Sequence, residues 1–353
     1  MAKKIMLWPS ARSKFVKDNN MKLIFSSLLF IAVVMIVQNY YIYSFMYAVK
    51  LLLMIVVSYY ATRETEILFY VHDKDITRVE SKALIEKSYW RVTAMIYVLL
   101  IPLGTPLWLV AIGAAMASLF GKLLFGGFHH MVFHSSLVGV IMVTLGWRSI
   151  ENRAIFAKSL DNDIMTLIFD RPFFNETLSI GNMFDPANYL TSLEMLKLGQ
   201  YYEFLDVLFG AVPGIIVSGV LLLIVLAFLI YKKAVNYVTP LALIGSFFIT
   251  ASIFGLVQEQ AASFALFHLF SGSLLFVTVF VATDPITSPM SNGGKIVYGV
   301  VAGALTMVIR NGAANSEGII FGVLFMQMLT PMVNTWFNKK KKVVKKPVKK
   351  EAV

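Results

Sequence analysis

The segment at residues 210–231, GAVPGIIVSGVLLLIVLAFLIY, has no charged side chain in 22 residues. A helix of about 20 apolar residues is long enough to cross the roughly 30 Å hydrocarbon core of a membrane. Nine more apolar runs flank this segment, at approximately 23–38, 41–60, 90–103, 106–120, 136–148, 238–256, 262–282, 296–309 and 318–337. Hydrophobic residues make up 58% of the chain and charged residues 14%, which excludes an ordinary soluble protein. The sequence therefore predicts an all-α polytopic membrane protein with about ten transmembrane helices.

The ten runs form two groups of five, separated by a polar segment with nine acidic and five basic side chains. Because each half has an odd number of spans, the halves must face opposite ways in the membrane, as inverted repeats do. The predicted organisation is an N-terminal membrane half (1–148), an outer loop (149–209), a C-terminal membrane half (210–337) and a Lys-rich tail (338–353). The runs at 90–103 and 106–120 reach only about 20 Å each, so we expect them to be tilted, broken or half-spanning.

The distribution of Lys and Arg predicts the orientation of the chain. With the N-terminus inside, 24 Lys and Arg fall on the cytoplasmic side and 6 on the outer side, while Lys50 lies within a span. Positive charge collects on the cytoplasmic side, so both termini are expected there and the protein in the inner membrane. The tail has eight Lys and supplies most of the net charge of +11, so we expect a contact with anionic lipid and no nucleic-acid partner. Because the chain has no Cys, thiolate-bound iron–sulfur clusters are excluded.

The most specific stretch is FVATDPITSP at residues 280–289. Its two prolines disfavour a regular helix. Irregular backbone at membrane depth survives only against protein, a cavity or a ligand. Four polar side chains stand there, and we predict that they line a buried cofactor or ion site: Thr283, Asp284, Thr287 and Ser288. The alternative is a plain cytoplasmic turn.

The stretch HLFSGSLLFVTVFVATDPITSP (268–289), with the segment 293–334 that follows it, resembles the C-terminal half of the D subunit of the Rnf electron transport complex. The B subunit of the sodium-pumping NADH:quinone oxidoreductase is a close relative of that subunit. Residues 93–102 and FGKLLFGG (120–127) resemble the family more loosely. The resemblance covers most of the chain, and it implies an ion-translocating, flavin-dependent electron transport complex with other subunits of the Rnf type.

The resemblance also implies covalent FMN on a threonine of the outer loop, attached by a flavin transferase. The matching stretch runs from Asp185 to Thr191 and continues to Lys197, but Asn188-Tyr189-Leu190 stands where the family has S/T-G-A. We therefore predict FMN on Thr191, with Asp185 in its motif, and consider a second flavin. The alternative is that Thr191 and Glu194 form a capping box that opens a helix.

Other polar residues are weaker candidates. His129, His130 and His134 cluster where the family shows F-N-P-A instead of Phe133-His134-Ser135-Ser136, and His130 and His134 have an i, i+4 spacing that suits a metal. A haem pair with His268 is conceivable, but ordinary polar residues at a helix end are favoured and we predict no metal site.

Charged residues in and beside the spans form a second group. Lys50 lies mid-span, which is costly, so it either pairs or snorkels, or takes part in ion coupling together with Asp284. Asp284, Arg310 and Glu317 fall at span ends, where charge is expected to be solvated. Gly299, Gly303, Gly318 and Gly322 are expected at close helix contacts.

These observations predict an integral subunit of an ion-translocating (Na⁺ or H⁺), flavin-dependent electron transport complex, and not an enzyme that acts alone. Two other functions remain open. A secondary transporter would show the same inverted halves and short, broken spans. A scaffold subunit that keeps the fold without flavin would explain the altered motif around Thr191.

Overall fold

The computed structural model describes residues 18–42, 45–147, 218–257, 263–312 and 318–338. Within these ranges all regular structure is helical, which confirms the predicted all-α membrane fold. Six helices are long and apolar enough to cross a membrane. They are α1 (Asp18–Ile42), α2 (Phe45–Lys74), α5 (Leu107–Gly121) with the short turn that follows it, α12 (Val238–Val257), α15 (Asn292–Gly312) and α16 (Gly318–Asn338). The predicted outer loop (149–209) and nearly all of the tail lie outside the described residues.

The remaining apolar runs form shorter helices: α4 (Trp90–Leu100), α6 (Ser135–Gly146), α11 (Gly219–Tyr231), α13 (Ser263–Phe270) and α14 (Leu274–Phe280). Helix α4 ends because Ile101 precedes Pro102, and Ile101 accordingly has extended backbone angles. The prediction of a broken or half-spanning segment at 90–103 is thus confirmed.

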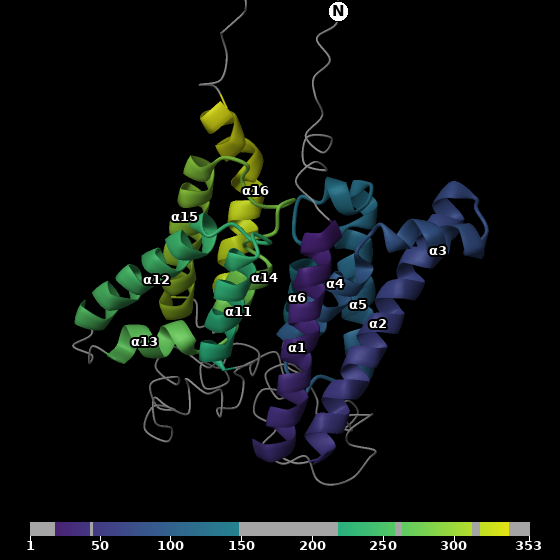
Figure 1. Cartoon of the computed structure of the whole chain (residues 1–353), viewed down its shortest axis with the longest axis horizontal. Coiled ribbons are helices and arrows are strands. Elements are labelled where there is room, and N and C mark those ends of the chain that lie inside the picture. Colours follow the sequence, from purple (N-terminus) through teal and green to yellow (C-terminus); the bar gives the residue numbers. More distant parts are fainter. Residues whose placement is uncertain (1–17, 43–44, 148–217, 258–262, 313–317, 339–353) are drawn as a thin grey trace, which may run out of the picture.

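Helices α1 to α6 form one group and α11 to α16 form a second group beside it (Figure 1). In the first group, α5 packs between α2 and α6, while α1 packs against α4. In the second, α15 packs between α12 and α16, while α11 packs against α14. The order of contacts therefore repeats, which supports two halves of common design; their inverted orientation stays a prediction.

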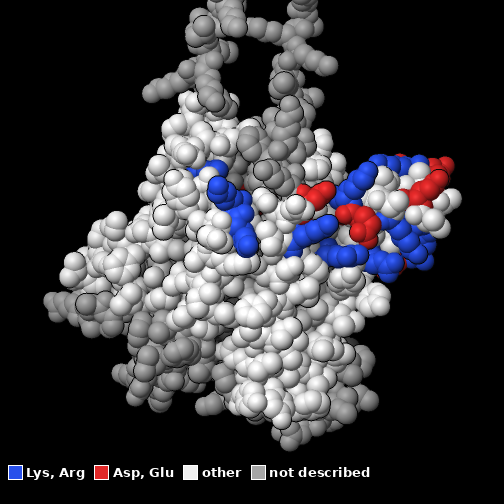
Figure 2. All heavy atoms as spheres, viewed as in Figure 1, with Lys and Arg blue, Asp and Glu red and all other residues white. Residues whose placement is uncertain are grey.

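Charged side chains gather at one end of the molecule. Helix α1 begins and α16 ends at this end (Figure 1), and Figure 2 shows the Lys, Arg, Asp and Glu of this view collected there and on the projecting helix α3 (Arg78–Glu86). The opposite end shows no charged residue among the described atoms of this face. This polarity is the pattern expected of a protein whose uncharged part lies in lipid.

Two expectations from the sequence are wrong in detail. The cytoplasmic loop at 61–91 is mostly helical, because α2 continues to Lys74 and α3 follows with a capping box of Thr77 and Glu80. The backbone N–H and the hydroxyl of Thr77 donate to the exposed Glu80 carboxylate and hold its pKa below the ordinary value. The run at 262–282 is two helices, because Gly272 adopts a positive φ of 70° and turns the chain between α13 and α14.

Glycines bring the long helices of the second half together, as predicted. A Cβ on Gly303 would lie 2.4 Å from the Leu243 carbonyl oxygen, and one on Gly299 would lie 2.9 Å from the Thr239 carbonyl oxygen, both on α12. Gly318 and Gly322 of α16 approach the backbone of α15 in the same way. These approaches let α15 pack between α12 and α16 without intervening side chains.

We expect Gly303→Ala to destabilise the protein, because the new methyl group meets the backbone of α12 and the helices must separate. Overpacking of this kind costs about 1–3 kcal/mol. The measurement is the apparent Tm of the purified protein in detergent. The matched control is Gly245→Ala on α12, since no atom lies within 4 Å of a Cβ at that position. Equal apparent Tm values for both variants would contradict the close packing.

Candidate ion or cofactor site between the two halves

The turn that follows α14 is held by Asp284. Its Oδ2 atom accepts hydrogen bonds from the Thr287 backbone N–H (3.0 Å) and from the Thr287 hydroxyl (2.9 Å). Only 7% of Asp284 is exposed, and Thr287 and Ser288 are buried too. The expectation of a solvated Asp284 at a span end is therefore wrong, because the turn folds back into the protein.

A glutamine connects this turn to the first half of the molecule. The side-chain amide of Gln327, on α16, donates to the Thr287 hydroxyl (3.1 Å), and its oxygen accepts from the backbone N–H of His134 (2.9 Å). His134 is the residue immediately before α6. A chain of hydrogen bonds thus runs from the Asp284 carboxylate to the first half. Sequence reasoning missed Gln327, although a lone amide within an apolar run was a usable signal.

A small cavity lies where these groups meet. Its volume of about 20 Å³ has space for roughly one water molecule. The polar wall combines Thr93, His134 and Ser135 of the first half with Thr283 and Asp284 of the second, and the rest is apolar. Thr287 and Ser288 do not line it.

The volume decides between the predicted occupants of this cavity. A water molecule or a small ion fits, whereas an isoalloxazine ring system does not. The predicted residues Thr283 and Asp284 are thus brought together around a space suited to an ion.

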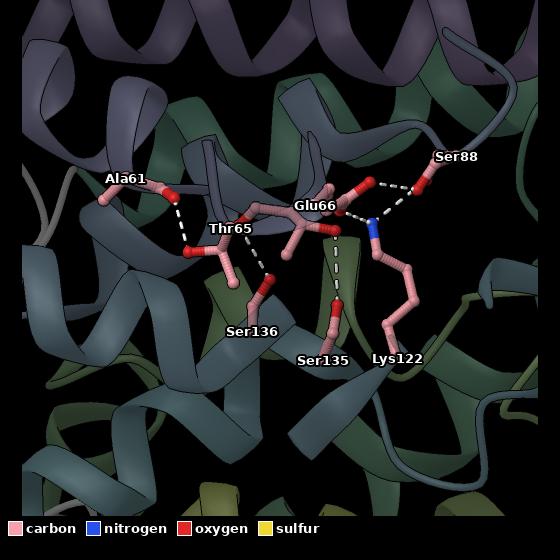
Figure 3. A network of polar contacts seen from close by, with 8 residues as sticks. Ala61, Thr65, Glu66, Ser88, Lys122, Ser135 and Ser136 are labelled. Atoms are coloured by element: carbon pink, nitrogen blue, oxygen red, sulfur yellow. Dashed lines mark hydrogen bonds and ion pairs between the residues drawn. The ribbon is translucent and has the colours of Figure 1, made fainter. Parts of the chain in front are cut away.

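A buried ion pair supports the first-half wall of the cavity (Figure 3). Lys122, directly after α5, pairs with Glu66 of α2, and both side chains are fully buried. The Ser88 hydroxyl donates to Glu66 (2.6 Å), and Lys122 donates to the Ser88 carbonyl oxygen (3.2 Å). Ser88 lies two residues before α4, so the pair fixes the start of the helix that carries Thr93. The count of Lys and Arg places Lys122 on the cytoplasmic side, whereas the packing of α2 against the end of α5 buries it beside Glu66.

Comparison with known proteins agrees with this architecture. The sequence profile of the NQR2, RnfD, RnfE family matches residues 10–342. The chain belongs to this family. It is 26% identical over 321 residues to the D subunit of the ion-translocating oxidoreductase complex of Actinobacillus succinogenes, covering 82% of each chain. The corresponding D subunits of Buchnera aphidicola and Pseudomonas aeruginosa are each 27% identical over 260 residues, which is 69% of this chain and 74% and 71% of theirs. The predicted resemblance is confirmed.

In this member of the family, the second half also has a buried basic residue that donates to backbone carbonyl oxygens. Arg310, near the end of α15, is 1% exposed and donates to the carbonyl oxygens of His268 (2.6 Å) and Ser271 (3.1 Å). These carbonyls belong to the last turn of α13 and to the residue that follows it, ahead of α14, as the Ser88 carbonyl lies ahead of α4. The expectation that Arg310 is solvated is wrong, because the break between α13 and α14 frees carbonyls that need a buried donor.

The histidine cluster does not form the predicted helical spacing. His130 ends a short 3₁₀ turn and His134 precedes α6, so the two do not share a helix face. Within the described residues no group of three or more His, Cys, Asp or Glu could hold a metal. His134 is instead buried in the cavity wall, and His268 is buried against Phe264.

Of the remaining predicted residues, the structure describes Lys50 only. Lys50 is buried on α2 (2% exposed) and is not in the cavity wall. Thr191 and Asp185 lie outside the described residues, so covalent FMN stays a prediction, as does the alternative helix cap. Glu317 lies outside the described residues as well.

We expect Lys122→Met to lower stability strongly, because it leaves the Glu66 carboxylate buried without its cation. Removing one partner of a buried pair costs about 3–5 kcal/mol, whereas replacing both with apolar groups can be neutral. The apparent Tm in detergent should fall in Lys122→Met and recover in the double variant Lys122→Met with Glu66→Leu. Lys82→Met on α3 is the control, since Lys82 is exposed. A double variant as unstable as the single one would contradict the pairing.

Proposed function

We propose that this chain is an integral subunit of an ion-translocating, flavin-dependent electron transport complex, working with other subunits of the Rnf type and not as an enzyme by itself. Family membership and the names of the curated relatives support this function. The observation that carries the ion-translocating part is the buried Asp284 carboxylate in a small polar cavity between the two halves.

Asp284 is proposed as the ion-coupling residue. A carboxylate away from water is costly and is retained where it serves a partner or a pathway. Thr287 holds Asp284 through Oδ2, while Thr283, Thr93 and Ser135 supply hydroxyl oxygens around the same space. The site lies where α4 and the end of α14 face each other, so a small relative movement of the two halves would change its size. Lys50 is retained as a second candidate for coupling because it is buried within α2.

Thr191, with Asp185 in the same motif, is proposed to bear FMN attached by a flavin transferase, and a second flavin is proposed elsewhere in the protein. The flavin supplies one- and two-electron redox chemistry, which the side chains of this chain lack. The small cavity is assigned to the ion and not to a flavin.

The protein is proposed to lie in the cytoplasmic membrane with both termini in the cytoplasm and residues 149–209 outside. The 24 to 6 distribution of Lys and Arg supports this orientation. The start of α1 and the end of α16 also lie at the same, charged end of the molecule (Figures 1 and 2). The Lys-rich tail would then face anionic lipid on the cytoplasmic surface.

We expect Asp284→Asn to reduce ion transport about tenfold or more, because the charge that binds the ion is lost. Thr287→Val should have a smaller effect, since the backbone N–H of residue 287 still holds Asp284; a hydrogen bond to a charged group contributes about 1.5–3 kcal/mol. The measurement is ion uptake into sealed membrane vesicles, energised with a reductant that the wild-type complex oxidises. Asp73→Asn and Thr335→Val are exposed controls. Wild-type transport in Asp284→Asn would reject the coupling site.

We expect a peptide containing Thr191 to be heavier by one FMN less water when the protein is made together with its flavin transferase. Mass spectrometry of the digested protein measures this directly, and Thr191→Ala should abolish the added mass. An unmodified Thr191 peptide from cells in which a partner subunit is flavinylated would favour the scaffold alternative.

The orientation of the chain is tested alongside, because the proposed flavin-bearing segment 149–209 is expected outside. In the Cys-free chain, Asn162→Cys should react with an impermeant maleimide in whole cells and Lys82→Cys on α3 should not. The reverse labelling would reject the orientation.

A further inference from the structure

The cavity wall includes an ionisable ring directly beside the proposed ion site. His134 is 6% exposed, and its Nδ1 atom has no hydrogen-bond partner among the described residues. Its backbone N–H donates to Gln327, which ties this residue to the second half beside the cavity. A buried polar atom without a partner is unusual and calls for a ligand or a proton.

The Asp284 carboxylate is arranged to meet this ring. Both hydrogen bonds recorded for it, from the backbone and hydroxyl of Thr287, go to Oδ2. Gln327 bonds Thr287 and the His134 backbone at the same time, so the two cavity walls are held in register. Asp284 and His134 both line the same space of about one water molecule.

We propose that His134 and Asp284 bind the translocated ion as a proton, taken up between the imidazole and the carboxylate across the contact between the two halves. This proposal rests on the proposed function and names the ion for the same site. Uptake adds one proton and one positive charge to the pair, and release returns both, so no further reactant is required.

The composition of the wall favours a proton over Na⁺. Hard cations such as alkali metal ions are held by several oxygen ligands, whereas imidazole nitrogen suits softer transition metals. A neutral His134 would give Na⁺ a poor ligand, and a protonated one would repel it. A cavity with room for one water leaves little space to retain a hydration shell.

Few charged or titratable groups face the pair from the elements packed against it. Lys122, beyond α5, is the nearby cation, and Glu66 of α2 neutralises it. Tyr298 of α15 faces Asp284 from the second half. From α4, α6 and α16 come the uncharged groups Thr93, Ser135 and Gln327. Among the described residues of the cavity wall, His134 and Asp284 are thus the titratable groups.

The test uses vesicles carrying the whole complex, with a pH-sensitive dye and ²²Na⁺ as the two probes. We expect the wild type to take up protons when K⁺ replaces all Na⁺. His134→Asn keeps a polar side chain that does not titrate, and it should lower proton uptake about tenfold or more and flatten the dependence of the rate on pH. His130→Asn, an exposed histidine nearby, should behave as wild type.

Uptake of ²²Na⁺ that persists in the presence of a protonophore, with His134→Asn as active as wild type, would overturn the proton assignment. If Asp284→Asn stops transport and His134→Asn does not, the proton assignment fails while the coupling site stands. Wild-type transport in both variants rejects the coupling site itself. Should the variants not insert, infrared titration of the wild-type complex decides. A histidine band that titrates with a midpoint unmoved by Na⁺ supports the proposal; no such band, or a midpoint shifted by Na⁺, overturns it.

Discussion

Helices that stop inside the apolar part of a membrane protein leave backbone groups that water cannot reach, and this constraint shapes both halves of the chain. Helices α4 and α14 are 11 and 7 residues long, far too short to span. Lys122 donates to the Ser88 carbonyl oxygen ahead of α4. Arg310 donates to two carbonyl oxygens at the break between α13 and α14. The burial of Lys122 and Arg310 therefore follows from the breaks in the neighbouring helices. A buried cation needs a neighbouring anion or acceptor, and Glu66 supplies that partner for Lys122.

Close helix packing in the second half contrasts with a contact between the halves that few hydrogen bonds hold. Glycines bring α15 against α12 and α16 at backbone distance, so neither pair can slide without losing close contacts. Across the halves, the hydrogen bonds recorded among the described residues are few: Gln327 to the His134 backbone, and a long one of 3.5 Å from Asn20 to the Ala234 carbonyl oxygen. A site at this contact is thus the place where a movement between halves has the largest effect on an ion.

The sequence was sufficient for most of the apolar helices and for the turn at 280–289, because long uncharged runs and closely spaced prolines act locally. It was insufficient for predicting which side chains contact one another in the fold. Arg310 was expected to be solvated, and Asp284 was predicted both in a buried site and at a solvated span end. Position along the chain does not reveal that the turn folds inward. Glu66 and Lys122 are 56 positions apart, and only the packing of α2 against α5 brings them together. Gln327 carries no charge, so neither charge counting nor a motif singled it out.

The cavity wall shows where this chain departs from its family. The second-half wall carries Thr283 and Asp284, within the stretch where the resemblance is most specific. The first-half wall carries His134 and Ser135, within the stretch where the family's F-N-P-A pattern is replaced. Ser135 is within hydrogen-bonding distance of the Thr93 hydroxyl (3.2 Å), and Ser136 donates to the Thr93 carbonyl oxygen (2.9 Å), contacts that Pro and Ala side chains could not make. The replacement therefore changes both the titratable character of the wall and the way α6 is held to α4.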